Sequence, residues 1–216
     1  KVEPQEGDSF RSGGVGFGAY NRDKRGLGID LKVEAGRAAF LDMVRSADVV
    51  LENYRSGVRD RLGLSDAVLL GVNPRLVTVR ITPFGPSGPK AAYAASDLTV
   101  WAAAGPLALT RDPGTGKPLA MAIPQAFHQA AMDAACGAMM ALTARWQSGP
   151  GQHVEVSAQT SNMLATLFGH LAASVGHEGY AMGNAGMTKK DLDLSGSGSR
   201  TNKTFWQVRD GTVEMH

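Results

Sequence analysis

The chain has 216 residues, of which 43% are hydrophobic and 19% are charged, a balance typical of globular proteins. Its formal net charge of +2 is too small to indicate a nucleic-acid partner. No apolar run reaches the roughly 20 residues that cross a bilayer, and no signal segment opens the sequence, so we expect no membrane contact. The single cysteine, Cys136, excludes an internal disulfide and favours a reducing compartment, and we therefore expect a cytoplasmic protein.

The first part of the chain alternates between strand-like and helix-like patterns. In chain order we expect a glycine-rich loop at 8–20, a strand at 26–32, a helix at 33–47, a strand at 48–54, a helix at 64–76 with Ser65 as a candidate cap, and a strand at 75–85. This order is typical of βαβ units, which place strands in a parallel sheet. We therefore predict an α/β large domain with a doubly wound, mostly parallel sheet.

The remaining segments predict further helices and the approach to a second, smaller domain. They are a helix at 96–105 capped by Ser96 or Asp97, a polar segment at 105–121, a long helix at 124–146, a strand at 152–157, an apolar helix at 158–175 and a hairpin turning at Asp210-Gly211. We predict a large domain over 1–175, a linker over 176–203 and the start of a small domain at 204–216. The opening "KVEPQEGD" is typical of a strand exit, so we expect that the N-terminal part of the large domain is missing.

Three motifs are similar to known ligand-binding motifs, but each lacks a feature that the known motif requires. The stretch "GGVGFGAY" lacks the spacing of a dinucleotide-binding fingerprint and precedes its strand instead of following it. In "DPGTGKP", Pro118 replaces the hydroxyl residue of a phosphate-binding loop, so a turn is the better interpretation. The segment "HEGY" has no second histidine at zinc-ligand spacing, and we expect no metal site.

Basic residues gather beside the predicted strands. Lys24 and Arg25 precede the strand at 26–32, whereas Arg55, Arg59 and Arg61 follow the strand at 48–54. Ligands of open α/β sheets bind at the carboxyl ends of the strands, and the arginine fork suits phosphate. On composition alone, a solvated charged loop is the more common explanation, so both interpretations stay open at this point.

Four segments, in this order along the chain, are specific enough to compare with a known family: "NRDKRGLGIDLK", "ADVVLENYRSGVRDRLGL", "NPRLVTVRITPFGPSGP" and "ARWQSGPGQHVEVS". They resemble the family III CoA-transferases of the CaiB/BaiF type, which include formyl-CoA transferase, carnitine CoA-transferase, benzylsuccinate CoA-transferase and the 2-methylacyl-CoA racemases. The resemblance implies a doubly wound large domain, a smaller domain and two chains interlocked as a dimer. It also implies coenzyme A or acyl-CoA and carboxylic acids as substrates, without a metal.

The resemblance assigns a coenzyme A site to five residues by position. Asn53, Tyr54, Arg55 and Arg61 match residues that contact the coenzyme, and Lys24 matches a basic residue near its phosphates. Coenzyme A carries several negative charges on its diphosphate and 3′-phosphate, which agrees with this cluster of cations. The ring of Tyr54 is suited to line the adenine or the pantetheine arm.

The family's catalytic residue is an aspartate at the head of the long helix. It attacks the acyl-CoA thioester and forms a mixed anhydride that releases the CoA thiolate. Counting back from Arg145 and Gly151-Gln152, which match family landmarks, the place of this aspartate falls on Phe127. A phenylalanine cannot be a nucleophile, so the sequence predicts no catalytic residue at this position.

The neighbours of Phe127 are weaker candidates. His128 could act as a base in racemase or lyase chemistry, but it shares a helical face with Met132 and Met139, which favours a packed histidine. Asp133 lies on a different face, and we interpret it as a helix-surface or interface carboxylate. Cys136 is predicted to be a small core residue.

Together, these observations predict the nucleophile-lacking chain of a heteromeric CoA-transferase, whose homologous partner would carry the aspartate. Two alternatives stay open: an acyl-CoA racemase or lyase that uses His128, and a non-catalytic CoA-binding pseudoenzyme. Assembly with a second copy of the same chain is the alternative to a heteromer.

Overall fold

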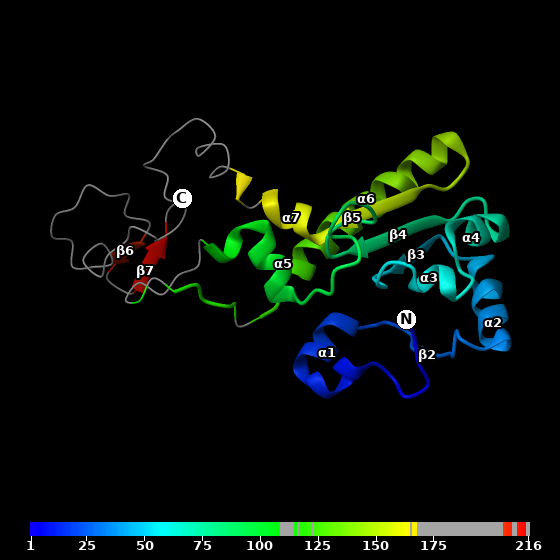
Figure 1. Cartoon of the computed structure of the whole chain (residues 1–216), viewed down its shortest axis with the longest axis horizontal. Coiled ribbons are helices and arrows are strands. Elements are labelled where there is room, and N and C mark those ends of the chain that lie inside the picture. The colour runs from blue at the N-terminus through cyan, green and yellow to red at the C-terminus, as the bar shows by residue number, and fades with distance from the viewer. Residues whose placement is uncertain are drawn as a thin grey trace. The chain divides into compact units, whose positions relative to one another are not determined.

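The structure is a computed structural model that describes residues 1–108, 115, 117–121, 123–164, 166–167, 205–208 and 211–214. Figure 1 shows the order of its elements along the chain. The strands are β1 (Val2–Glu3), β2 (Leu27–Gly28), β3 (Val49–Glu52), β4 (Val77–Thr82), β5 (His153–Ser157), β6 (Phe205–Val208) and β7 (Gly211–Glu214). The helices are η1 (Ser9–Gly13), α1 (Val15–Asn21), α2 (Glu34–Val44), α3 (Val58–Arg61), α4 (Asp66–Val72), α5 (Asp97–Ala104), η2 (Pro106–Ala108), α6 (Ala126–Ser148) and α7 (Ala158–Leu164).

The chain divides into two compact units, and α6 contributes residues to both. The first unit holds residues 1–92 and 131–156, and the second holds 93–130 and 157–216. In the first unit, β3, β4 and β5 form a sheet in that order, and β1 pairs with β2. Both β1–β2 and β3–β4 are parallel, with Val49 opposite Val77 in the second pair. The predicted α/β architecture with parallel strands is therefore confirmed.

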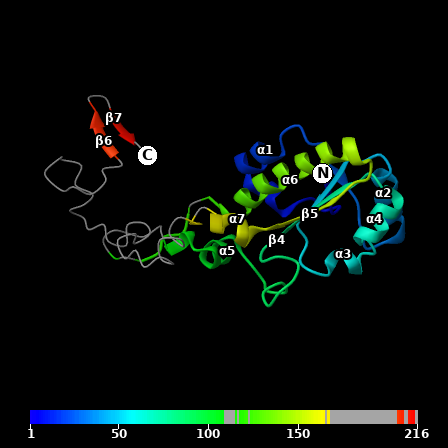
Figure 2. The ribbon, with the colours of Figure 1, turned by 90° about the horizontal axis from the view of Figure 1, so that it is seen from above.

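The core of the first unit forms where helices cover the sheet. Strand β4 is buried at all but one position, as expected for a central strand covered on both faces. Figure 2 shows α6 on one side of β3–β4–β5, with α3 and α4 on the other. Val44, Leu64, Leu69 and Leu76 form a fully buried cluster on the α4 side. Helix α4 begins where predicted, since the Ser65 hydroxyl accepts the Val68 N–H at 3.4 Å.

The segment at 8–20 corrects one prediction. We expected a loop because of its glycines, but it forms η1 and α1. The Asp8 carboxylate accepts the Phe10 N–H at 2.8 Å and so caps η1. The ring of Phe10 then lies 6.4 Å from that of Phe17, centroid to centroid, and 6.3 Å from that of Tyr20. This aromatic cluster holds the two short helices together despite the low helix propensity of glycine.

Hydrogen bonds to backbone carbonyls join the helices of the second unit. The Ser96 hydroxyl and the Thr99 side chain form a capping box at the start of α5, which confirms Ser96 as the cap. Buried Asn162 on α7 donates to the carbonyls of Ala126 (2.9 Å) and Ala158 (2.6 Å). The Thr166 hydroxyl donates to the Ala104 carbonyl at 3.3 Å. These bonds tie α7 to the first turn of α6, and tie Thr166, just after α7, to the end of α5.

The C-terminal part is described over two short strands. Strands β6 and β7 pair antiparallel, as the predicted hairpin requires, with Val208 opposite Gly211. The turn at 209–210, the linker predicted at 176–203 and the domain boundaries predicted at 175/176 and 203/204 lie outside the described residues. In the part of the chain that the structure describes, no helix is both long enough and apolar enough to span a membrane.

Candidate functional site

Phe127 is the second residue of α6, at the place where the sequence predicted the missing nucleophile. The first turn of this helix holds no acidic residue, and Phe127 is half-buried. The Asp97 carboxylate accepts the backbone N–H of Gln125 at 3.0 Å and that of Phe127 at 3.2 Å. Asp97 therefore satisfies two of the N–H groups that a helix start leaves without a partner. This carboxylate is an anchor for the helix start.

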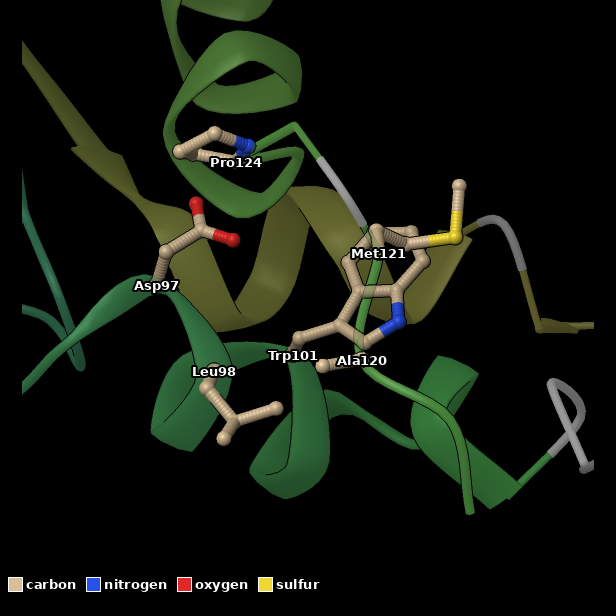
Figure 3. Close-up of a pocket in the computed structure, with 6 residues that line it drawn as sticks. All are labelled: Asp97, Leu98, Trp101, Ala120, Met121 and Pro124. Atoms are coloured by element: carbon tan, nitrogen blue, oxygen red, sulfur yellow. The ribbon is translucent and has the colours of Figure 1, made fainter.

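A small pocket lies beside this helix start (Figure 3). Its volume is about 180 Å³, and its lining is Asp97, Leu98, Trp101, Ala120, Met121 and Pro124. Apolar side chains make up most of this lining, and the Asp97 carboxylate is turned toward Pro124 and the first turn of α6. The pocket therefore offers apolar contact next to a carboxylate that already caps a helix.

For other residues of α6, the burial that the structure shows differs in part from the burial that the sequence pattern predicted. His128 is half-buried, but Met132 and Met139, which were expected to pack on the same face, are 64% and 61% exposed. Asp133 is half-buried. Cys136 is exposed, so the prediction of a core residue is wrong. The buried line of the helix consists of Ala126, Ala130, Ala134, Ala141 and Arg145. Cys136 lies two positions beyond Ala134 and so points away from this line.

The coenzyme-binding candidates Asn53, Tyr54 and Arg55 form the loop that follows the carboxyl end of β3. All three are exposed, and so is Arg61, at the end of the short helix α3. Tyr54 is 39% exposed, and the partial burial of its phenol, together with the charge of Glu52, raises the pKa of Tyr54. The structure thus places these candidates where open α/β sheets bind ligands, although their role stays a prediction.

Lys24 occupies a different place. It lies in the turn before β2 and is exposed, and its backbone N–H donates to the Asn21 carbonyl at 3.1 Å. It therefore sits at the amino end of its strand, whereas the loop of Asn53 follows the carboxyl end of β3.

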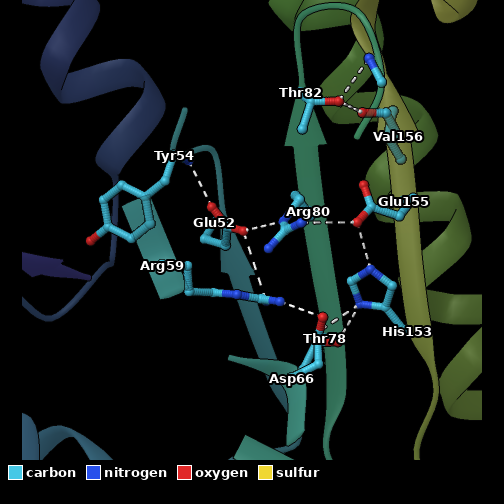
Figure 4. Close-up of polar contacts among 11 residues, drawn as sticks. Glu52, Tyr54, Arg59, Asp66, Thr78, Arg80, Thr82, His153, Glu155 and Val156 are labelled. Atoms are coloured by element: carbon cyan, nitrogen blue, oxygen red, sulfur yellow. Dashed lines mark hydrogen bonds and ion pairs between the residues drawn. The ribbon is translucent and has the colours of Figure 1, made fainter. Parts of the chain in front are cut away.

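Beneath the loop of Asn53, charged side chains from three strands and two helices form a closed network (Figure 4). Glu52 accepts the Arg80 Nε–H at 2.7 Å, and Arg80 Nη1 lies 3.4 Å from Glu155. His153 Nε2 lies 2.6 Å from Glu155, and His153 Nδ1 lies 3.4 Å from Asp66. Arg59 pairs with Asp66 and approaches Glu52 at 3.8 Å, which closes the network.

The network shifts the pKa values of two of its members, Asp66 and Arg80. Burial alone would raise the pKa of Asp66, but the hydrogen bond from Arg59 and the charges of His153 and Arg59 outweigh it and lower the pKa. Burial would likewise lower the pKa of Arg80, yet the hydrogen bond to Glu52 and the nearby carboxylates raise it. Both groups are therefore held in their charged forms.

Sequence reasoning missed this network, because its members lie up to about a hundred positions apart in the chain and follow no motif. One signal was available. Glu52, Arg80 and Glu155 are charged residues inside strands and lie next to aliphatic residues, and charges in such places are found paired. Within the described residues, no group of three or more His, Cys, Asp or Glu side chains is placed to hold a metal ion.

Parallel strands, covering helices and an exposed polar loop after the carboxyl end of β3 define an α/β protein. The chain belongs to CoA-transferase family III, whose family model matches residues 1–212. The resemblance found in the sequence is thereby confirmed.

Relatives and solved structures agree with this assignment. The chain is 42% identical over 146 residues to the succinyl-CoA:(R)-benzylsuccinate CoA-transferase subunit BbsE of Thauera aromatica, covering 68% of this chain and 35% of that protein. It is 39% identical over 165 residues to the acetyl-CoA:oxalate CoA-transferase of Acetobacter aceti, covering 73% and 42%. A CAIB/BAIF family protein from Brucella suis superposes with a TM-score of 0.77 at 28% identity, covering 98% and 56%. The chain thus spans about two fifths of these two curated relatives and about half of the solved one.

Proposed function

We propose that this chain is the nucleophile-lacking subunit of a heteromeric family III CoA-transferase, which moves CoA between carboxylic acids. The observation that carries the proposal is Phe127 at the head of α6, where the family resemblance expects the catalytic aspartate. A first helical turn without any acidic residue supports it further. The similarity to BbsE, which is named as a subunit, favours a chain that works together with another.

In this proposal, the homologous partner supplies the carboxylate. Its oxygen attacks the thioester carbonyl of the acyl-CoA, the C–S bond breaks, and CoA leaves as the thiolate while the acyl group stays on the carboxylate as a mixed anhydride. The thiolate then attacks the carbonyl carbon of the partner's carboxyl group, which releases the first acid and leaves a CoA thioester on the partner chain. The second acid attacks this thioester, which frees the thiolate again and forms a second mixed anhydride. The thiolate finally attacks the acyl carbonyl of the second acid, which gives the new acyl-CoA and the free carboxylate. The side chain of Phe127 has neither the lone pair nor the charge for this attack, so this chain cannot perform the step at that position.

The chain's own contribution is to bind the coenzyme. Arg55 and Arg61 are exposed cations near the carboxyl end of β3, and they suit the diphosphate and the 3′-phosphate. The side chains of Asn53 and Tyr54 supply a polar contact and a ring for stacking. Lys24, the remaining candidate assigned by the resemblance, lies before β2 and outside this loop. Completing an interlocked dimer with the partner is the chain's second role. We place this enzyme in the cytoplasm, since CoA chemistry and a free thiol both fit a reducing compartment.

The test is reconstitution. The full-length protein is purified alone and together with a homologous subunit that has aspartate at the position of Phe127, and CoA transfer is assayed on a panel of acyl-CoA and acid pairs. We expect transfer from the complex only. Transfer by the single chain would refute the proposal. Racemisation of an acyl-CoA, or elimination from it, by the single chain that is lost in His128→Ala would favour the racemase or lyase alternative. CoA binding without any transfer by the complex would favour a pseudoenzyme.

A further inference from the structure

The charged network beneath the loop of Asn53 does more than neutralise buried groups. We call its six members the Glu52 ring: Glu52, Arg59, Asp66, His153, Glu155 and Arg80. Glu52 and Arg59 are 8% and 4% exposed, so the part of the ring next to the loop is shielded from water. Glu155 and His153 are more accessible and lie on β5, two strands away from β3. The ring therefore connects the loop to a distant strand.

The ring holds the loop at both of its ends. At the first end, Glu52 Oε2 accepts the backbone N–H of Tyr54 at 2.7 Å, which fixes the direction in which the chain leaves β3. At the other end, Arg59 is anchored by Asp66 and lies near Glu52. The six residues between these anchors include three of the coenzyme-binding candidates, and Arg61 follows two positions later. Figure 4 shows Tyr54, Glu52 and Arg59 together on the side of the ring that faces away from β5.

The two carboxylate oxygens of Glu52 accept hydrogen bonds from different donors. Oε1 accepts from Arg80, while Oε2 is left for the Tyr54 N–H. Arg80 in turn divides its guanidinium between Glu52 and Glu155. Without the charge of Glu155, Arg80 would have Glu52 as its remaining ion-pair partner within the described residues and would compete with the Tyr54 N–H for it. The charge of Glu155 on β5 therefore influences the hydrogen bond that fixes the backbone of the loop at Tyr54.

We propose that Arg80 and Glu155 are positioning residues for coenzyme A binding, which act through Glu52 to hold the Asn53–Arg55 loop in its binding conformation. This inference rests on the proposed function, because it takes the loop to be the coenzyme site. Neither residue is expected to touch the coenzyme. Their effect is preorganisation: a loop already held in its bound shape loses less conformational freedom on binding.

The test compares Glu155→Gln with Glu34→Gln in the full-length protein. Glu34 lies exposed in the first turn of α2, outside the ring, so its variant controls for the loss of one negative charge. With coenzyme A itself as the probe, we expect Glu155→Gln to raise the Kd by roughly three- to tenfold, corresponding to about 0.7–1.4 kcal/mol, and the control to leave it unchanged. Hydrogen exchange at the Tyr54 amide should be faster in Glu155→Gln alone.

A double-mutant cycle separates positioning from a general loss of stability. If Glu155 acts through the loop, its substitution should weaken binding much less when Arg55→Ala has already removed a loop contact. A folded Glu155→Gln with unchanged Kd and unchanged Tyr54 exchange would overturn the inference. Arg80→Lys, which keeps the charge but cannot bridge both carboxylates, replaces Glu155→Gln if that variant does not fold. A wild-type protein that binds no coenzyme A would instead refute the proposed function.

Discussion

Arg145 provides a direct test of how α6 is fixed to the sheet. Its guanidinium is buried, with Nη1 donating to the Arg75 carbonyl at 2.8 Å and Nη2 donating to Asp48 at 2.7 Å. These two bonds join the last turns of the helix to the segments that enter β3 and β4. Arg145→Met removes both bonds but keeps most of the apolar stem, so the packing of that stem is largely preserved.

The expected loss follows from the surroundings of the two acceptors. The Asp48 side chain is 75% exposed, so water replaces its partner and the ion pair contributes about 0.5–1 kcal/mol. The Arg75 carbonyl loses a hydrogen bond from a charged donor, which is worth about 1.5–3 kcal/mol. Removing a buried charge recovers part of this cost, and we expect a net destabilisation of about 2 kcal/mol.

Thermal unfolding followed by circular dichroism measures this change. For a chain of this size, about 2 kcal/mol corresponds to a fall in Tm of roughly 4–8 °C. The matched control is Arg45→Met, because the Arg45 side chain is 67% exposed and, within the described residues, forms an ion pair only with Asp42 of the preceding helix α2. We expect the control to stay within about 0.5 kcal/mol of the wild type. Equal Tm values for the two variants would refute the role assigned to Arg145.

Three further predictions concern backbone packing, pH dependence and ligand binding. Gly151→Ala should destabilise the protein by about 2 kcal/mol or more in urea unfolding, because the new Cβ would lie 1.9 Å from a backbone oxygen. The control is Gly71→Ala, which should be neutral or stabilising because no atom lies within contact distance of its new Cβ. The pKa of Asp66 is lower in the folded state than in the unfolded state, so its carboxylate stabilises the fold above about pH 4 and this stabilisation is lost as the pH falls further. In Asp66→Asn, the fall of Tm at acidic pH should therefore be less steep than in the wild type. Arg61→Ala should raise the Kd for coenzyme A about tenfold in calorimetry, and an Arg45→Ala variant with unchanged Kd is the control.

Local signals in the sequence were sufficient for several elements. The Ser65 and Ser96 caps, the buried strand β4 and the long helix α6 follow from capping chemistry and hydrophobic periodicity, which depend on neighbouring residues. The strand was predicted to run to Tyr54 but ends at Glu52, so the loop after β3 begins two residues earlier than expected. That this loop follows a carboxyl strand end was predicted from the strand order.

Features that depend on distant contacts could not be read in this way. The glycines at 8–20 predicted a loop, but an aromatic cluster stabilises helices there. Cys136 was assigned to the core from its residue type, although the buried line of α6 passes through Ala134 and Ala141 and leaves Cys136 exposed. The Glu52 ring joins β3, β4 and β5, and no local pattern predicts which charges meet.

The central claim is that catalysis in the complex belongs to the partner chain. The most direct measurement is intact-protein mass spectrometry of the purified two-subunit complex, quenched in acid shortly after addition of an acyl-CoA. We predict a covalent acyl adduct on the partner chain and none on the chain that carries Phe127. An acyl adduct on this chain would contradict the account.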